Sequence, residues 1–138
     1  MKTRILSLAI ALVSILCIGI VYANNAKWTK GPSLKNNTIS GMATGLGTGP
    51  YDMQITGYYD CVNNGKKTPG SANWSKLDVT IPIDPQQTGG NFKISEVIPN
   101  QCDHANWTFK TCNLQVALYQ NGKKILGPTN VEGSDICN

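Results

Sequence analysis

Apolar and polar residues alternate along much of the chain after residue 23. In residues 51–61 and again in residues 76–84, the odd-numbered positions are largely apolar and the even-numbered positions largely polar. Because successive side chains of a strand point to opposite faces, this pattern predicts two strands, each with one buried and one solvent-facing side. Pro82 has no N–H to give to a neighbouring strand, so we expect the second strand to lie at a sheet edge or to carry a bulge.

The strongest local signal is a hairpin near the carboxyl-terminal end. Two apolar-rich runs, residues 114–120 and 123–126, flank the dipeptide Asn121-Gly122. Asn-Gly tolerates positive φ at both central positions, which predicts a two-residue type I′ turn. The resulting register pairs Leu118 with Ile125 and Tyr119 with Lys124.

Residues 38–44, 91–98 and 106–111 show further strand-like patterns, and helical periodicity is nearly absent after residue 23. Short strands separated by Gly, Asn and Pro turns are typical of all-β domains. We therefore predict an antiparallel two-sheet β-sandwich, immunoglobulin-like or jelly-roll-like, with about six or seven strands. Its length fits one domain, residues 24–138.

Residues 1–23 have the features of a removable export signal. Lys2 and Arg4 precede a long apolar run that ends in Val-Tyr-Ala, whose first and third side chains suit a signal peptidase. We expect cleavage after Ala23 and a secreted, extracellular or periplasmic domain of residues 24–138 with no integral membrane span. An uncleaved membrane anchor is the alternative, because the apolar run is close to the shortest that spans a bilayer.

Four cysteines follow the expected cleavage site, and their even number in an exported chain favours two disulfides. Their spacing contains no C-x-x-C pair, so a zinc site is disfavoured and we expect no bound metal. Four cysteines allow three pairings. Of these we choose the one whose second bridge would hold the polar carboxyl-terminal tail, namely Cys61–Cys102 with Cys112–Cys137.

The charge after residue 23 is low. This part of the chain carries ten Lys, no Arg, six Asp and two Glu, a formal net charge of +2. Nucleic-acid binding needs many clustered cations, so we expect no nucleic-acid partner. The composition also excludes a coiled coil and a disordered tail. We expect a monomer without a cofactor.

Signals for catalysis are weak. His104, the single histidine, follows Asp103, which is the order that could orient a general base. Two exposed loop residues beside a cysteine are the simpler interpretation, and no G-x-S-x-G motif supplies a nucleophile. Gly45-Leu46-Gly47-Thr48-Gly49 lacks the spacing and the following helix of a phosphate-binding loop and is interpreted as a turn. We therefore expect no catalytic residue, and keep a small secreted hydrolase that uses Asp103 and His104 as an alternative.

Aromatic residues remain the best candidates for ligand contacts. Two tryptophans occur in polar segments, and two tyrosines fall on outward strand faces; the four are Trp28, Trp74, Tyr58 and Tyr119. Exposed rings stack on sugars or anchor a protein partner at low entropic cost. Our leading hypothesis is a secreted, non-catalytic recognition module for a glycan, an extracellular protein or the cell envelope. A disulfide-braced envelope or inhibitor protein, with residues 63–75 as its contact loop, is a further alternative.

One set of motifs resembles a known group of proteins. It comprises the turn Ala43-Thr44-Gly45-Leu46-Gly47-Thr48-Gly49-Pro50-Tyr51, the strand that runs to Cys61, the Cys102…Asn106-Trp107-Thr108 element and the final hairpin. Over residues 38–127 the chain is similar to small secreted bacterial β-sandwich proteins of uncharacterised function. The resemblance implies a sandwich with a bridge like Cys61–Cys102 and implies no known activity. Cys112 and Cys137 are additions to that pattern.

Overall fold

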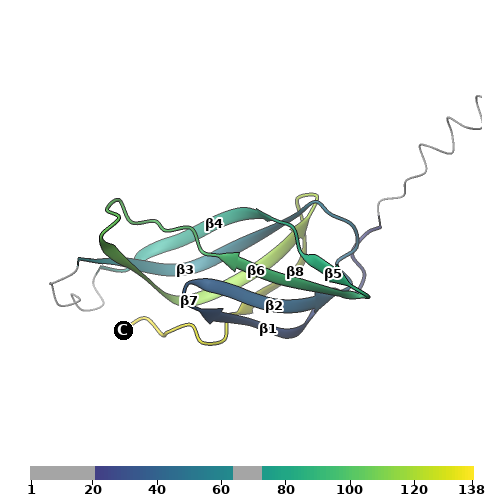
Figure 1. The fold of residues 1–138 in the computed structure, drawn as a ribbon, viewed down its shortest axis with the longest axis horizontal. Helices are drawn as coiled ribbons and strands as arrows, with labels where there is room; N and C mark the ends of the chain where they lie inside the picture. The colour runs from purple at the N-terminus through teal and green to yellow at the C-terminus, as the bar shows by residue number, and fades with distance from the viewer. Residues whose placement is uncertain (1–20, 64–72) are drawn as a thin grey trace, which may run out of the picture.

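The chain forms a β-sandwich of two antiparallel four-stranded sheets, seen in a computed structural model that describes residues 21–63 and 73–138 (Figure 1). Residues 1–20 of the expected export signal and residues 64–72 of the expected contact loop lie outside the described residues. The strand orders are β1-β2-β6-β5 and β4-β3-β7-β8. The strands are β1 (Lys27–Lys35), β2 (Thr38–Thr44), β3 (Tyr51–Asn63), β4 (Ser75–Ile83), β5 (Gln86–Thr88), β6 (Asn91–Val97), β7 (Trp107–Gln120) and β8 (Lys123–Asn130).

The all-β sandwich is confirmed, with eight strands where we predicted six or seven, because β1 and β5 lie outside the predicted strands. The predicted strands at residues 106–111 and 114–120 are one strand, β7, which continues through a bulge. At this bulge Asn113 has a φ of 49°, and the register shifts opposite Gly57 of β3. An extra residue in one strand breaks the alternation without ending the pairing, which made the sequence look like two strands.

The core lies between the sheets and receives the apolar side of every long strand. Along β3 the odd-numbered side chains Tyr51, Met53 and Ile55 are buried, as the alternation predicted. Phe109 is also buried, whereas Trp107 is half-buried. From the opposite sheet, β2 and β6 contribute four buried side chains to the core, namely Ile39, Ala43, Phe92 and Ile94.

The edge position predicted for the strand with Pro82 is confirmed, whereas the register predicted for the final hairpin is only partly correct. The strand with Pro82 is β4, an edge strand, as expected from the missing N–H. In the final hairpin Tyr119 pairs with Lys124 as predicted, but Leu118 pairs with Leu126 and not with Ile125. The cause is a register shift in β8 directly after the turn, which the Asn-Gly dipeptide alone does not reveal.

Both expected disulfides are present, Cys61–Cys102 and Cys112–Cys137. Two such bridges indicate an oxidising environment outside the cytoplasm. Within residues 21–63 and 73–138, no helix has the length and apolarity needed to cross a membrane.

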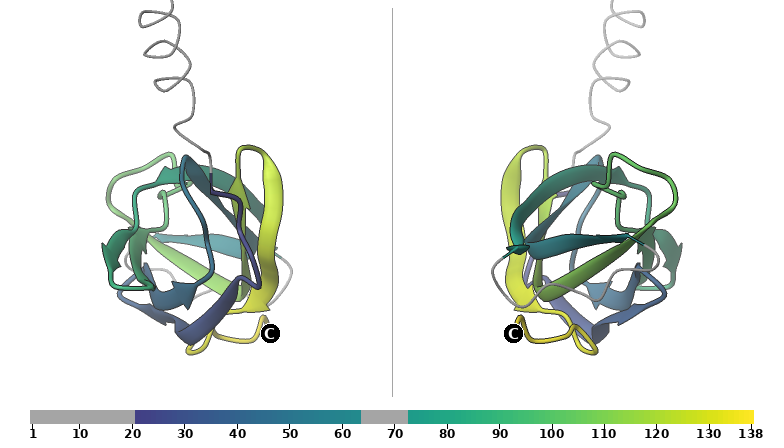
Figure 2. Two further views of the ribbon diagram at one scale, coloured as in Figure 1. Left: turned by 90° about the vertical axis from the view of Figure 1, so that its right-hand side faces the viewer. Right: turned by 90° about the vertical axis from the view of Figure 1, so that its left-hand side faces the viewer.

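The carboxyl-terminal tail after β8 connects the two sheets. Glu132 N–H donates to Pro32 O, and Glu132 O accepts from Leu34 N–H, both at 2.8 Å, so the tail pairs with edge strand β1. Farther along, Asp135 O accepts from Asn113 N–H of β7 at 2.8 Å. In the end-on views the tail passes along the base of the sandwich beside β1 (Figure 2). Residues 131–137, here called the strap, therefore link β1 of one sheet to β7 of the other, and the Cys112–Cys137 bridge holds them in place.

Trp28 faces the interior, near the open edge of β1. It pairs with Ala43 of β2, and its half-buried ring lies against Gly41. A Cβ atom at position 41 would come within 2.7 Å of the indole Cζ3. The indole Nε1 is buried and has no hydrogen-bond partner among the described residues. Trp28 thus contributes to core packing and lies apart from the other three candidate aromatic residues.

Removing the second disulfide is expected to loosen the strap. Replacing Cys112 and Cys137 with alanine together should lower the free energy of unfolding by about 3 kcal/mol, because the open chain regains loop entropy. Denaturant unfolding measures this change. Amide exchange in residues 131–137 should accelerate at the same time, whereas Ile136→Ala, at a side chain that is 76% exposed, should change neither. Equal unfolding midpoints for the unaltered protein, the double cysteine variant and Ile136→Ala would show that the second disulfide does not stabilise the fold.

Gly41 tests the packing of Trp28. Gly41→Ala should destabilise the domain by about 1–3 kcal/mol, because the added methyl group overlaps the indole ring in a packed interior. The shift in indole fluorescence and the denaturant midpoint report the effect. Gly90→Ala is the matched control, since a Cβ atom at position 90 meets nothing within 4 Å. Equal midpoints for the two variants would mean that Trp28 does not pack against Gly41.

Candidate functional site

The outer face of the β4-β3-β7-β8 sheet carries three of the four predicted contact residues. Tyr58 of β3 and Tyr119 of β7 are both on the side that faces away from the core. Trp74 directly precedes β4, and the pairing of Tyr59 with Ser75 places it beside Asp60, another outward residue of β3. We call this surface, from Tyr119 to Trp74, the outer face.

One end of the outer face holds a chain of directed hydrogen bonds. The Tyr119 hydroxyl donates to Gln54 Oε1 at 3.0 Å, and Gln54 Nε2 donates to Asp78 Oδ1 at 2.9 Å. Asp52 lies between Tyr119 and Pro82 in the cross-strand pairing. A shallow cavity of about 310 Å³ opens here and is lined by Asp52, Gln54, Thr80, Tyr119 and Gly122.

The register of three strands produces this arrangement. Gln54 of β3 pairs with Thr80 on one side and with Ala117 on the other. Ala117 points outward yet is only 5% exposed, so the larger side chains around it cover it. Its short side chain leaves room beside Gln54, and Tyr119, two residues farther along β7, reaches back to the amide.

The other end of the outer face carries two aromatic side chains, Tyr58 and Trp74. Tyr58 is 44% exposed and pairs with Lys76 of β4 and Cys112 of β7. The end of the tail folds toward this point, because Cys137 is bonded to Cys112. The Trp74 indole Nε1 then donates to the main-chain oxygen of Asn138 at 3.1 Å.

The two ends are separated by the length of six residues of β3, from Asp52 to Tyr58. At a rise of about 3.4 Å per residue, they lie about 20 Å apart. Between them the outward residues are short and polar, including Thr56, which pairs with Asp78 and with Gln115. Gln115 in turn donates from Nε2 to Asn130 Oδ1 at 2.8 Å. The outer face is therefore a long polar strip with aromatic side chains at both ends.

The charges on this strip are mixed. Its carboxylates belong to Asp52, Asp60 and Asp78, and its ammonium groups to Lys76, Lys110 and Lys124. A balanced set of donors and acceptors suits a neutral ligand rich in hydroxyl groups better than a highly charged one. Gln54, at the centre of the hydrogen-bond chain, was not selected from the sequence. The only signal for it was its even-numbered position on β3, which it shares with the outward residues Asp52, Tyr58 and Asp60.

Asp103 and His104 lie in an exposed loop. The His104 ring is tilted against Trp107, with 4.6 Å between ring centroids, and His104 O accepts from Trp107 N–H at 3.1 Å. These contacts are those of a turn supported by an aromatic neighbour. In the part of the chain that the structure describes, no three His, Cys, Asp or Glu side chains are grouped so as to hold a metal ion.

Comparison with known proteins identifies no relative of this chain. No protein-family model matches it, and neither a curated protein nor a solved structure does so. Of the resemblance to small secreted bacterial proteins, the structure supports the disulfide-containing β-sandwich.

Proposed function

We propose that this protein is a secreted, non-catalytic recognition module that binds an extended, neutral oligosaccharide along its outer face. The observation that carries the proposal is the placement of Tyr58, Tyr119 and Trp74 on one sheet face, with hydrogen-bonding side chains between them. The export signal and the disulfides support delivery of the domain to an extracellular or periplasmic site, where such ligands occur.

Sugar recognition combines two kinds of contact, and the outer face offers both. The C–H faces of a pyranose ring pack on aromatic side chains, which is the role proposed for Tyr119 and Tyr58. Sugar hydroxyl groups need acceptors and donors held in fixed directions. Gln54 is held by Tyr119 on one side and Asp78 on the other, so its amide is oriented before any ligand binds.

The shape of the strip favours a glycan over a folded protein partner. The outer face is polar along its centre and about 20 Å long by strand geometry, whereas protein interfaces bury a broad apolar centre. An oligosaccharide of several units fits a strip of this length. Ordered water and weak individual contacts are expected, so affinity should depend on several rings binding in succession.

On a glycan array, Tyr119→Ala should lose most of the oligosaccharide binding that the unaltered protein shows. Removing the ring takes away the stacking surface and also frees Gln54, so affinity should fall by about tenfold or more. Tyr119→Phe keeps the ring and loses only the bond to Gln54, and a smaller loss is expected. Isothermal titration with the strongest array ligand measures both.

The matched control is Val97→Ala, because Val97 is 65% exposed on the opposite sheet. Its affinity should equal that of the unaltered protein. Oligosaccharide binding that survives Tyr119→Ala, Tyr58→Ala and Trp74→Ala alike would refute the outer face as the site. Absence of binding to every neutral oligosaccharide tested would refute the glycan as the ligand.

A further inference from the structure

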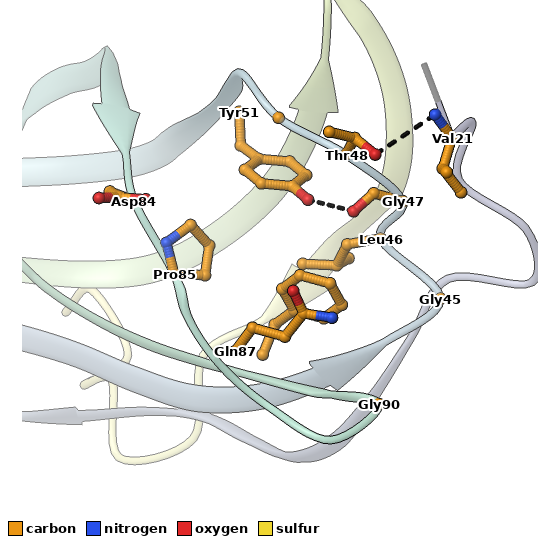
Figure 3. A pocket seen from close by; sticks show the side chains of 12 residues that line it. Val21, Gly45, Leu46, Gly47, Thr48, Tyr51, Asp84, Pro85, Gln87 and Gly90 are labelled. Atoms are coloured by element: carbon orange, nitrogen blue, oxygen red, sulfur yellow. Dashed lines mark hydrogen bonds between the residues drawn. The ribbon is translucent and has the colours of Figure 1, made fainter. Parts of the chain in front are cut away.

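Residues 21–23 lie in a slot at one end of the sandwich, between the β2–β3 loop and the end of β7. Their main chain is held by two residues. Thr48 N–H donates to Val21 O at 2.7 Å. Thr48 Oγ1 accepts from Val21 N–H at 3.3 Å, the contact drawn as a dashed line in Figure 3. Gln120 completes the set: its Oε1 accepts from Ala23 N–H and its Nε2 donates to Val21 O, each at 2.9 Å.

The slot recognises main chain and leaves side chains free. Gln120 is only 4% exposed, and its carboxamide presents the same donor and acceptor as a peptide group. The side chains of Val21 and Tyr22, by contrast, are 61% and 74% exposed. Gly47 forms the floor, since a Cβ atom there would come within 2.4 Å of Val21 O and 2.7 Å of Ala23 N.

Two cavities flank this segment. One, of about 500 Å³, is lined by Val21 together with Leu46, Tyr51 and Phe92. In it the Tyr51 hydroxyl donates to Gly47 O, and burial raises the pKa of that hydroxyl above its ordinary value, so it stays a donor. The second, of about 200 Å³, is lined by residues that include Tyr22, Ala23, Gln120, Lys123 and Lys124. Residues 21–23 form the wall between the two cavities.

Cleavage after Ala23, the site expected from the sequence, would change this end of the molecule in two ways. It would remove the wall, so that the cavities join above Gly47, and Gln120 would lose the partners that Val21 and Ala23 supply. It would also turn Asn24 N into an α-ammonium group. That nitrogen already lies 3.0 Å from Gly45 O, to which it donates.

We propose that the processed domain binds the extended carboxyl-terminal end of another polypeptide in this slot. The main chain of the ligand would take the bonds of Thr48 and Gln120, and its terminal carboxylate would meet the α-ammonium group of Asn24. The ligand must end there because the next atom along the path of residues 21–23 is Asn24 N itself. Lys123, which pairs with Gln120 and lines the adjoining cavity, adds positive charge on this side of the slot.

This slot is separate from the outer face. It is formed by the β2–β3 loop and the inward Gln120, whereas the outer face uses outward residues of β3, β4 and β7. The occupant is therefore a second ligand of different chemistry. Loss of either site leaves the other intact.

The test uses residues 24–138, which include all eight strands and both disulfides, with Asn24 as the authentic first residue. The probe is a fluorophore-labelled tetrapeptide of the sequence Ile20–Ala23 with a free carboxyl terminus, followed by fluorescence anisotropy. It should bind residues 24–138, and the same peptide with a terminal amide should bind about tenfold more weakly, because the charge-assisted contact is lost. A chain that begins at Val21 should not bind either peptide.

Gln120→Glu tests the side chain at nearly constant shape. It removes a donor and places a negative charge near the ligand carboxylate, so the tetrapeptide should bind about tenfold more weakly. Gln86→Glu, at an exposed position that lines neither of the two cavities, is the control and should bind normally. Oligosaccharide binding by Gln120→Glu should match that of the unaltered domain, which shows that the variant is folded. Its unfolding midpoint should fall, because the carboxylate cannot replace the bond that Gln120 Nε2 donates to Thr48 O.

Three results would overturn the proposal. The first is equal binding by the chains that begin at Val21 and at Asn24. The second is equal affinity for the free carboxylate and the amide. The third is no binding of the tetrapeptide to folded residues 24–138 at millimolar concentration. None of them bears on the oligosaccharide site.

Discussion

The register between β3 and β7 is the constraint on which the rest of the structure depends. Their pairing runs from Tyr51 opposite Gln120 to Asn63 opposite Trp107, and it joins the outer strands β4 and β8 into one sheet. Side chains alternate across a strand, so a slip of one residue would exchange the core with the surface. Burial of Met53, Ile55, Val116 and Leu118 on one side therefore fixes which side chains face outward.

Both proposed sites follow from this alternation at the end of β7. Tyr119 faces outward and holds Gln54, while the next residue, Gln120, faces inward and holds residues 21–23. One strand end thus supplies an outward ring for one ligand and an inward amide for another. The strap, held by Cys137, is bonded to the middle of the same strand, next to the bulge at Asn113.

The sequence predicted the parts of the fold that depend on local pattern. Alternation placed β3 and β4 correctly, and Pro82 indicated an edge. The parity of the cysteines predicted two bridges, and the need to hold the polar tail selected the observed pairing among three. Features that depend on distant contacts were not predictable in this way. β1 was missed because its segment, which contains the inward-facing Trp28, is largely polar, and β7 appeared as two strands because of the bulge at Asn113.

The candidate sites were predicted only in part, for the same reason. Tyr58 and Tyr119 were assigned to outward faces from alternation alone, and the structure places them on one sheet face. Trp28 sits in a polar segment yet turns inward, because Gly41 on the neighbouring strand leaves room for its ring. Gln54 had only its even-numbered, outward position on β3 as a sequence signal, and Gln120 had none. Their importance comes from partners 24 to 99 residues away along the chain.

The proposal that the outer face is the recognition surface is tested most directly by NMR. The isotopically labelled domain is titrated with its strongest oligosaccharide ligand. The account predicts shifts of the Gln54 and Asn130 side-chain amides and of backbone amides from Asp52 to Tyr58. Thr48 and the Gln120 amide should remain unchanged. Shifts confined to the exposed loop at His104, to the β1-β2-β6-β5 sheet or to the slot at Gln120 would contradict it.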